Sequence, residues 1–86
     1  MKTITSIKHA IAYFKENSTT KITRTIGGSE YETIIPPVGF KRLIITDEHG
    51  VSVMFGSHIY SNYAAILERG TINQGCKIAK IKLYYL

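Results

Sequence analysis

Little in the sequence could cross-link the chain or place it in a membrane. It has one cysteine, Cys76, which excludes an internal disulfide, and it has no tryptophan. Its longest apolar runs, such as residues 43–45, are far shorter than the roughly 20 residues that cross a bilayer. The N-terminus has no apolar stretch of the kind found in secretory signals. We therefore expect an intracellular protein without membrane contact, nuclear in a eukaryote and cytoplasmic in a bacterium or phage.

Acidic residues are also scarce. The chain has 6 Asp and Glu residues against 11 Lys and Arg residues, which gives a formal net charge of +5. Such an excess favours an anionic partner, either the phosphates of a nucleic acid or an acidic protein segment. With 44% hydrophobic and 20% charged residues, the chain of 86 residues has the composition of a folded protein and the length for one core. We predict a single domain over residues 1–86.

One helix is predicted near the N-terminus, over residues 5–17. Apolar side chains recur there at spacings of three and four, which is the single stripe of an amphipathic helix. Either Thr5 or Ser6 can cap its start, and Asn17 supplies a polar end. The stripe consists of Ile4, Ile7, Ala10, Ile11 and Phe14.

Most of the remaining chain has the period of two and the β-branched residues that are typical of strands. The pair Gly27-Gly28 either closes a hairpin or bends one long strand, and residues 47–50 form the turn of a further hairpin. Alternation slips at Ala79 and Lys80, which predicts a bulge in the last strand. The predicted strand segments are residues 20–26, 30–35, 40–46, 51–60 and 76–86.

A second, short helix is predicted between the last two strand segments, with Ser61 as its N-cap and Gly70 at its C-terminal end. The resulting order is helix, curved strand or hairpin, hairpin, short helix, strand. It matches the oligonucleotide/oligosaccharide-binding (OB) fold, in which a helix lies between the third and fourth strands. The predicted fold class is therefore mainly β (α+β), a small OB-like curved barrel with an additional N-terminal helix.

Residues 36–47 carry a resemblance to a known family. They read PPVGFKRLIITD, which looks like the proline-led second strand and the Ser/Thr-Asp turn of the N-terminal OB domain of the large subunit of replication protein A. The resemblance extends over residues 36–86. It implies a basic groove that docks acidic amphipathic helices of DNA-repair partners and binds single strands weakly. Lys41 and Arg42 match the family's basic second-strand positions.

The end of the chain departs from that family. The family's domain continues into a fifth strand after the position of Tyr85, whereas this sequence ends at Leu86. Unless residues 20–35 supply two strands, the predicted barrel keeps an open edge, and an unpaired edge is a site for another chain. A partner subunit or a second copy of this chain is expected there.

No pattern of catalytic or metal-binding residues is present, so we predict a protein that is not an enzyme and needs no cofactor. The histidines at positions 9, 49 and 58 are spread over a helix, a turn and a strand, and one cysteine makes no zinc pattern. Glu30 and Glu32 have the spacing of one strand face, and we interpret them as a solvated edge and not as a catalytic acid pair.

Basic residues gather instead on the first, second and last strand segments. If the barrel forms, they make a stripe interleaved with Tyr31, Phe40, Tyr60 and Tyr84, which is the pattern of a single-strand binding surface. The alternative is that the lysines are scattered surface charges and the aromatic residues are core. The candidate binding residues are Lys21, Arg24, Lys41, Arg42, His58, Tyr60, Lys77, Lys80 and Lys82.

Three functions therefore stay open. The first is a binding module for single-stranded nucleic acid in DNA replication, repair or telomere maintenance, and it predicts a steep dependence on salt. The second is a protein-interaction module that docks an acidic helical peptide or adds a strand at its open edge. The third is a small phage or mobile-element accessory protein that inhibits a host factor.

Overall fold

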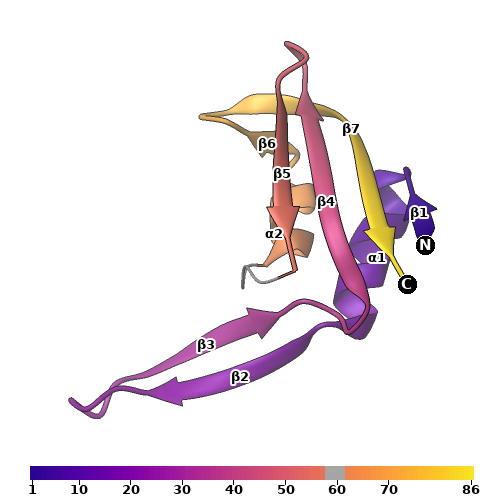
Figure 1. The fold of residues 1–86 in the computed structure, drawn as a ribbon. Helices are drawn as coiled ribbons and strands as arrows, with labels where there is room; N and C mark the ends of the chain where they lie inside the picture. The colour runs from indigo at the N-terminus through magenta and orange to yellow at the C-terminus, as the bar shows by residue number, and fades with distance from the viewer. Residues whose placement is uncertain (58–61) are drawn as a thin grey trace.

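The computed structural model describes residues 1–57 and 62–86. The described chain consists of strands with two helices, α1 after the first strand and α2 after the fifth (Figure 1). In chain order the elements are β1 (Lys2–Ile4), α1 (Ile7–Asn17), β2 (Thr19–Arg24), β3 (Glu30–Ile35), β4 (Phe40–Asp47), β5 (Ser52–Gly56), α2 (Tyr63–Arg69), β6 (Thr71–Ile72) and β7 (Cys76–Tyr85).

The strands form two separate antiparallel sheets. In the larger sheet the order is β1-β7-β4-β5, and β6 pairs with the first residues of β7. The second sheet is the β2–β3 hairpin alone. Both helices lie on one side of the larger sheet, behind it in the view of Figure 1. This arrangement confirms a mainly β, α+β class, with one sheet face covered and the other open.

The OB-like barrel is not confirmed, because the described strands form two sheets that do not close on each other. The prediction from sequence also missed β1. Its residue Thr3 lies opposite Tyr84, so β1 pairs along one edge of β7. Within the described residues, the outer strands of the β1-β7-β4-β5 order are β1 and β5. The physical reason is that three residues of strand before the helix are too short to be recognised by their alternation.

The core lies between the larger sheet and the helices. Alternate residues of β4 and β7 point into it, and aromatic side chains fill its centre: the rings of Phe14 and Phe40 are 5.3 Å apart and those of Phe14 and Tyr63 are 5.2 Å apart. Burying each large apolar side chain contributes about 1.5–3 kcal/mol, so this layer holds most of the molecule's stability. The core residues are Ala10, Phe14, Phe40, Leu43, Ile45, Tyr63, Ala64, Leu67, Ile81 and Leu83.

Both predicted helices are confirmed, with one change of cap. The Ser6 hydroxyl accepts a hydrogen bond from the His9 N–H (3.3 Å) at the start of α1, as its position predicts. The start of α2 is capped by Asn62, which accepts from the Ala65 N–H (3.0 Å). The predicted cap, Ser61, lies outside the described residues. Gly70 ends α2 with φ of +75°, a left-handed conformation that glycine adopts without strain.

The strand pairing shows what the Gly27-Gly28 pair does and whether the last strand contains a bulge. Gly27-Gly28 lies in the turn of a hairpin, since β2 and β3 pair from Thr19 and Ile35 outward. The bulge in the last strand is confirmed: Thr46 pairs with Lys80 and the next residue, Asp47, with Ile78, which leaves Ala79 as the extra residue. The strand expected over residues 51–60 corresponds to β5, which spans Ser52–Gly56, and residues 58–60 of that prediction lie outside the described residues.

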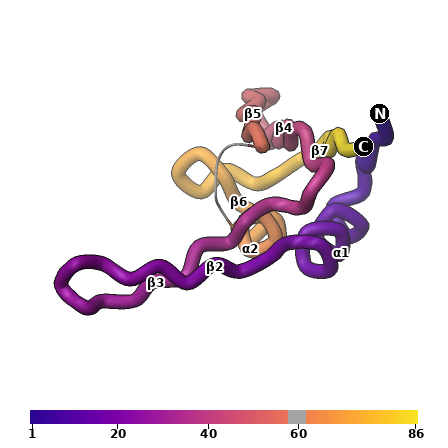
Figure 2. The backbone as a smooth tube through the Cα atoms, turned by 60° about the horizontal axis from the view of Figure 1, so that its bottom comes forward, coloured from indigo at the N-terminus to yellow at the C-terminus, as the bar shows by residue number. Residues whose placement is uncertain are grey.

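The β2–β3 hairpin projects from the body of the molecule. It leaves the end of α1 and extends past the β5 side of the larger sheet, which is visible in both Figure 1 and Figure 2. Its base borders the helices at a groove of about 360 Å³ that Thr20 and Ile34 share with Phe14 and Tyr63. Farther out its side chains are exposed on both faces, and Ile22 is 61% exposed.

Neither helix of the described ranges is long and apolar enough to cross a bilayer.

Candidate functional site

The open face of the larger sheet is the side opposite the helices. Its side chains alternate along each strand with the buried ones, and the Thr46 and Ser52 hydroxyls hydrogen-bond across it at 2.8 Å. The register brings Lys80 beside Thr46, and Lys82 beside Ile44. The open face comprises Thr3, Arg42, Ile44, Thr46, Ser52, Met54, Lys80, Lys82 and Tyr84.

Charge on this face has one sign. Arg42, Lys80 and Lys82 all project from it and are exposed. The chain's 6 acidic residues all lie within the described ranges and elsewhere in the fold. Because no Asp or Glu side chain lies among these cations, the face attracts anions more strongly than the net charge alone implies. The acidic residues are Glu16 on α1, Glu30 and Glu32 on β3, Asp47 at the end of β4, Glu48 in the following turn, and Glu68 on α2.

An aromatic residue sits among the cations. The guanidinium carbon of Arg42 lies 4.8 Å from the centre of the Tyr84 ring, a cation–π contact. A bulge sets this geometry: Phe40 pairs with Tyr85 and Arg42 with Tyr84, so Lys41 is the extra residue of β4. Phe40 therefore points into the core while Arg42 points out. Together Arg42 and Tyr84 present planar groups of the kind on which nucleobases stack.

Next to this pair is a groove of about 390 Å³. The half-buried side chain of Ile44 gives it an apolar part, and the stems of two lysines line it beside Tyr84. Threonines from β4 and from the segment after β1 add hydroxyl groups. The lining residues are Thr5, Ile44, Thr46, Lys80, Ile81, Lys82 and Tyr84.

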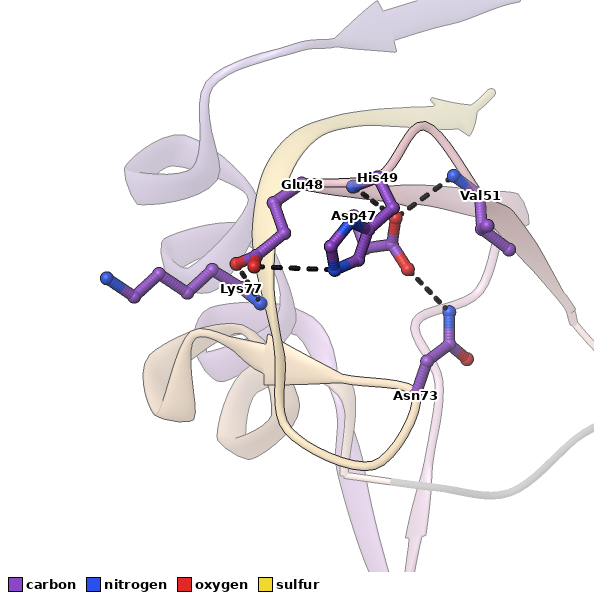
Figure 3. Close-up of polar contacts among 6 residues, drawn as sticks. All are labelled: Asp47, Glu48, His49, Val51, Asn73 and Lys77. Atoms are coloured by element: carbon purple, nitrogen blue, oxygen red, sulfur yellow. Dashed lines mark hydrogen bonds and ion pairs between the residues drawn. The ribbon is translucent and has the colours of Figure 1, made fainter.

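Asp47 stabilises the end of the sheet at which β4 ends and β7 begins (Figure 3). Its carboxylate accepts hydrogen bonds from the His49 N–H (2.8 Å), the Val51 N–H (3.0 Å) and the Asn73 side-chain amide (3.2 Å). Burial raises the pKa of this carboxyl, but the hydrogen bonds from Asn73, Val51 and His49 outweigh it, so the pKa lies below its ordinary value. The contact with Asn73 ties the β4–β5 turn to the turn between β6 and β7.

The structure brings together three of the predicted binding residues: Arg42, Lys80 and Lys82. Lys41 is their neighbour in sequence but occupies the bulge. Lys77 precedes the second bulge and pairs with β6, away from the other lysines. The Lys77 backbone N–H donates to the Glu48 carboxylate (2.9 Å). In Figure 3 the Lys77 side chain points away from the polar contacts around Asp47.

The other predicted residues are not on the open face. Lys21 and Arg24 lie on the projecting hairpin, where Arg24 forms an ion pair with Glu30 at 2.8 Å. His58 and Tyr60 lie outside the described residues. The aromatic stripe separates in the same way, because Tyr31 is on the hairpin, Phe40 is in the core, and Tyr84 belongs to the open face. The predicted stripe over three strands is therefore wrong as a single surface.

Sequence reasoning missed Ile44 and Thr3 as members of the open face. Ile44 lies between two core residues in an apolar run, so alternation alone leaves its side undecided until the bulges fix the phase. Thr3 belongs to the unpredicted strand β1. The usable signal was the neighbouring arginine: Arg42 and Ile44 are two residues apart and share a face.

Among residues 1–57 and 62–86, no group of three or more His, Cys, Asp or Glu side chains is placed to hold a metal ion. Comparison of the chain with protein-family models, with curated proteins and with solved structures found no match.

Proposed function

We propose that this protein is a non-catalytic module that binds single-stranded nucleic acid on the open face of its larger sheet. The observation that carries the proposal is the grouping of Arg42, Lys80, Lys82 and Tyr84 on a face from which every Asp and Glu side chain is absent. The phosphates of a single strand supply anions for these three cations. The bases of the same strand supply flat rings that can stack on the arginine and the tyrosine.

The strand spacing suits such a ligand. Tyr84 and Lys82 lie two residues apart on β7, and the same face continues to Lys80. Side chains at this spacing are about 7 Å apart, close to the distance between successive phosphates of an extended single strand. The single-stranded nucleic acid would run along β7 with its bases directed toward β4. There Arg42 offers the bases a planar contact and Ile44 an apolar one.

A second function is favoured by the apolar part of the face. Ile44 and Met54 are paired neighbours on β4 and β5, and Met54 is 63% exposed. A basic face with an apolar patch also fits an acidic amphipathic helix, the ligand that the resemblance to replication protein A implies. Nucleic acid is the stronger proposal because Arg42 and Tyr84 together offer planar groups for base stacking, a contact that an acidic helix does not require.

The test is a titration of a labelled mixed-sequence oligonucleotide over a series of salt concentrations. With three phosphate contacts, log K is expected to fall against log salt with a slope of about −2. The double variant Lys80→Gln/Lys82→Gln removes two of those contacts, so its affinity at low salt should drop roughly 50-fold and its slope should flatten to about −0.7. Tyr84→Leu should weaken binding by about 1–3 kcal/mol without changing the slope.

The matched control is Lys8→Gln/Lys77→Gln, which changes the net charge equally at two exposed positions off the open face. Its affinity should stay within about twofold of the unmodified protein, since distant surface charges are screened. Equal losses in the two double variants would show that net charge, not this face, attracts the ligand. Binding of an acidic helical peptide with no binding of the oligonucleotide would favour the second function.

A further inference from the structure

Strand β5 leaves one edge of the larger sheet without a partner strand among the described residues. The Asp47 N–H donates to the Val51 carbonyl at 2.9 Å where the β4–β5 hairpin begins. Since antiparallel pairs alternate in their bonding, Ser52 and Met54 direct their N–H and C=O groups to the free edge. At the far end of the strand, the Gly56 carbonyl accepts a bond from the Tyr63 hydroxyl at 3.3 Å.

This edge lacks the devices that normally protect one. Its sequence, SVMFG, contains no charged residue and no proline, and its register with β4 is continuous. The opposite edge strand, β1, has only three residues, one of which is Lys2. A short strand with a lysine is a protected edge, whereas β5 is a template for pairing.

We propose that β5 pairs antiparallel with β5 of a second copy of this chain, on a two-fold axis through Met54. In that register Met54 meets its own copy on the open face, and Val53 meets the partner's Phe55 on the helix side, so apolar side chains oppose one another on both faces. The charge distribution favours a second copy over an ionic ligand. Two chains of net charge +5 repel least where they meet through an uncharged strand.

The surroundings of the edge support the same occupant. Beside β5 lies a groove of about 290 Å³ that exposes Phe55, Ile66 and Ile72 to solvent. A second copy on this edge would cover these half-buried side chains. Five residues of paired strand bury less than the roughly 1,200 Å² of a stable interface, so another contact is required.

The β2–β3 hairpin supplies that contact. It extends past β5 on the side of the free edge, as both views show (Figures 1 and 2). A copy placed there by the two-fold axis lies alongside the hairpin, and Ile22 (61% exposed) and Tyr31 (51% exposed) are available to it. An isolated two-stranded hairpin is marginally stable at best in water. A contact with the second copy would stabilise this hairpin, which explains why it extends so far from the body of the molecule. The same axis places both open faces on one side of a continuous sheet.

The experiment measures self-association by sedimentation equilibrium for the unmodified chain, Met54→Lys and Met54→Glu, each alone and with the two variants mixed. The unmodified chain should dimerise in the micromolar range. Each variant alone places like charges directly opposite one another, so its dissociation constant should rise about fivefold or more. The equimolar mixture places Lys against Glu and should form a heterodimer at least about tenfold tighter than either homodimer.

Met54→Leu is the matched control, which keeps an apolar side chain of similar volume and should dimerise as the unmodified chain does. Circular dichroism verifies that each variant is folded. A second charged variant is Val51→Lys, at an exposed position in the preceding turn, which adds no charge at the two-fold axis. A monomer up to near-millimolar concentration, or a Lys and Glu mixture that associates no better than its components, would overturn the proposal. Neither result depends on oligonucleotide binding.

Discussion

The larger sheet and the β2–β3 hairpin are both antiparallel, yet they obtain their stability in different ways. In the sheet, β4 and β7 bury Leu43 and Leu83 completely against the helices. In the hairpin, six cross-strand pairs run from Thr19 and Ile35 to the Arg24–Glu30 ion pair, and the outer side chains remain in solvent. Backbone hydrogen bonds are present in both regions, so apolar burial is what distinguishes them.

This difference assigns separate roles to the two regions. A covered sheet holds the side chains of its open face in fixed positions, which a binding surface requires. A hairpin surrounded by solvent does not hold its side chains in fixed positions, and contact with another surface would stabilise it. The charges follow the same division: the cations of the open face have no carboxylate beside them, whereas Arg24 on the hairpin is already paired at 2.8 Å.

The largest expected effect comes from the covered side of the sheet. Leu83→Ala should lower the free energy of unfolding by about 2–5 kcal/mol, because Leu83 is fully buried and its removal leaves a cavity. Ile22→Ala on the hairpin is the control and should change it by about 0.5 kcal/mol or less. Urea denaturation measures both. Comparable losses in the two variants would show that the hairpin is packed as tightly as the sheet.

A smaller effect is expected at the end of the sheet. The ionised Asp47 carboxylate holds the turn, and its pKa lies below its ordinary value of 3.8. Its stabilisation is therefore complete above about pH 4 and is lost as the pH falls through the lower pKa of the folded state. Asp47→Asn should lower Tm at neutral pH and reduce the loss of Tm on acidification. The measurement is Tm from neutral pH down to about pH 2; parallel curves for the two proteins would contradict this role.

The smallest effect on the body should follow from removing the hairpin. Thr20 and Ile34 are paired neighbours, so a Gly-Gly link can replace residues 21–33 without moving the chain ends. The free energy of unfolding should change by about 1 kcal/mol or less, and oligonucleotide affinity by about twofold or less. Self-association should weaken, because the hairpin is the second contact of the proposed dimer. A shortened chain that loses oligonucleotide binding would place Lys21 and Arg24 in that site after all.

Local sequence determined the parts of the fold that depend on neighbours in the chain. The apolar spacing and Ser6 place α1, Gly70 ends α2, and the lost alternation at Ala79 marks a bulge. Each of these signals acts over a few residues, where capping, backbone freedom and side-chain period are decided. The same alternation, followed along β7, puts Lys80, Lys82 and Tyr84 on one face without help from any distant residue.

Tertiary structure alone decided which strands meet and what each face covers. The three residues of β1 have too little pattern to be recognised, and they become a strand only because β7 offers them an edge. Ile44 carries the same apolar side chain as Ile45, but two bulges set the phase that turns Ile44 out and Ile45 in. Strand pairing and burial depend on residues that are distant in sequence. The sequence therefore identified the basic residues, but only the assembled sheet determined which of them lie together.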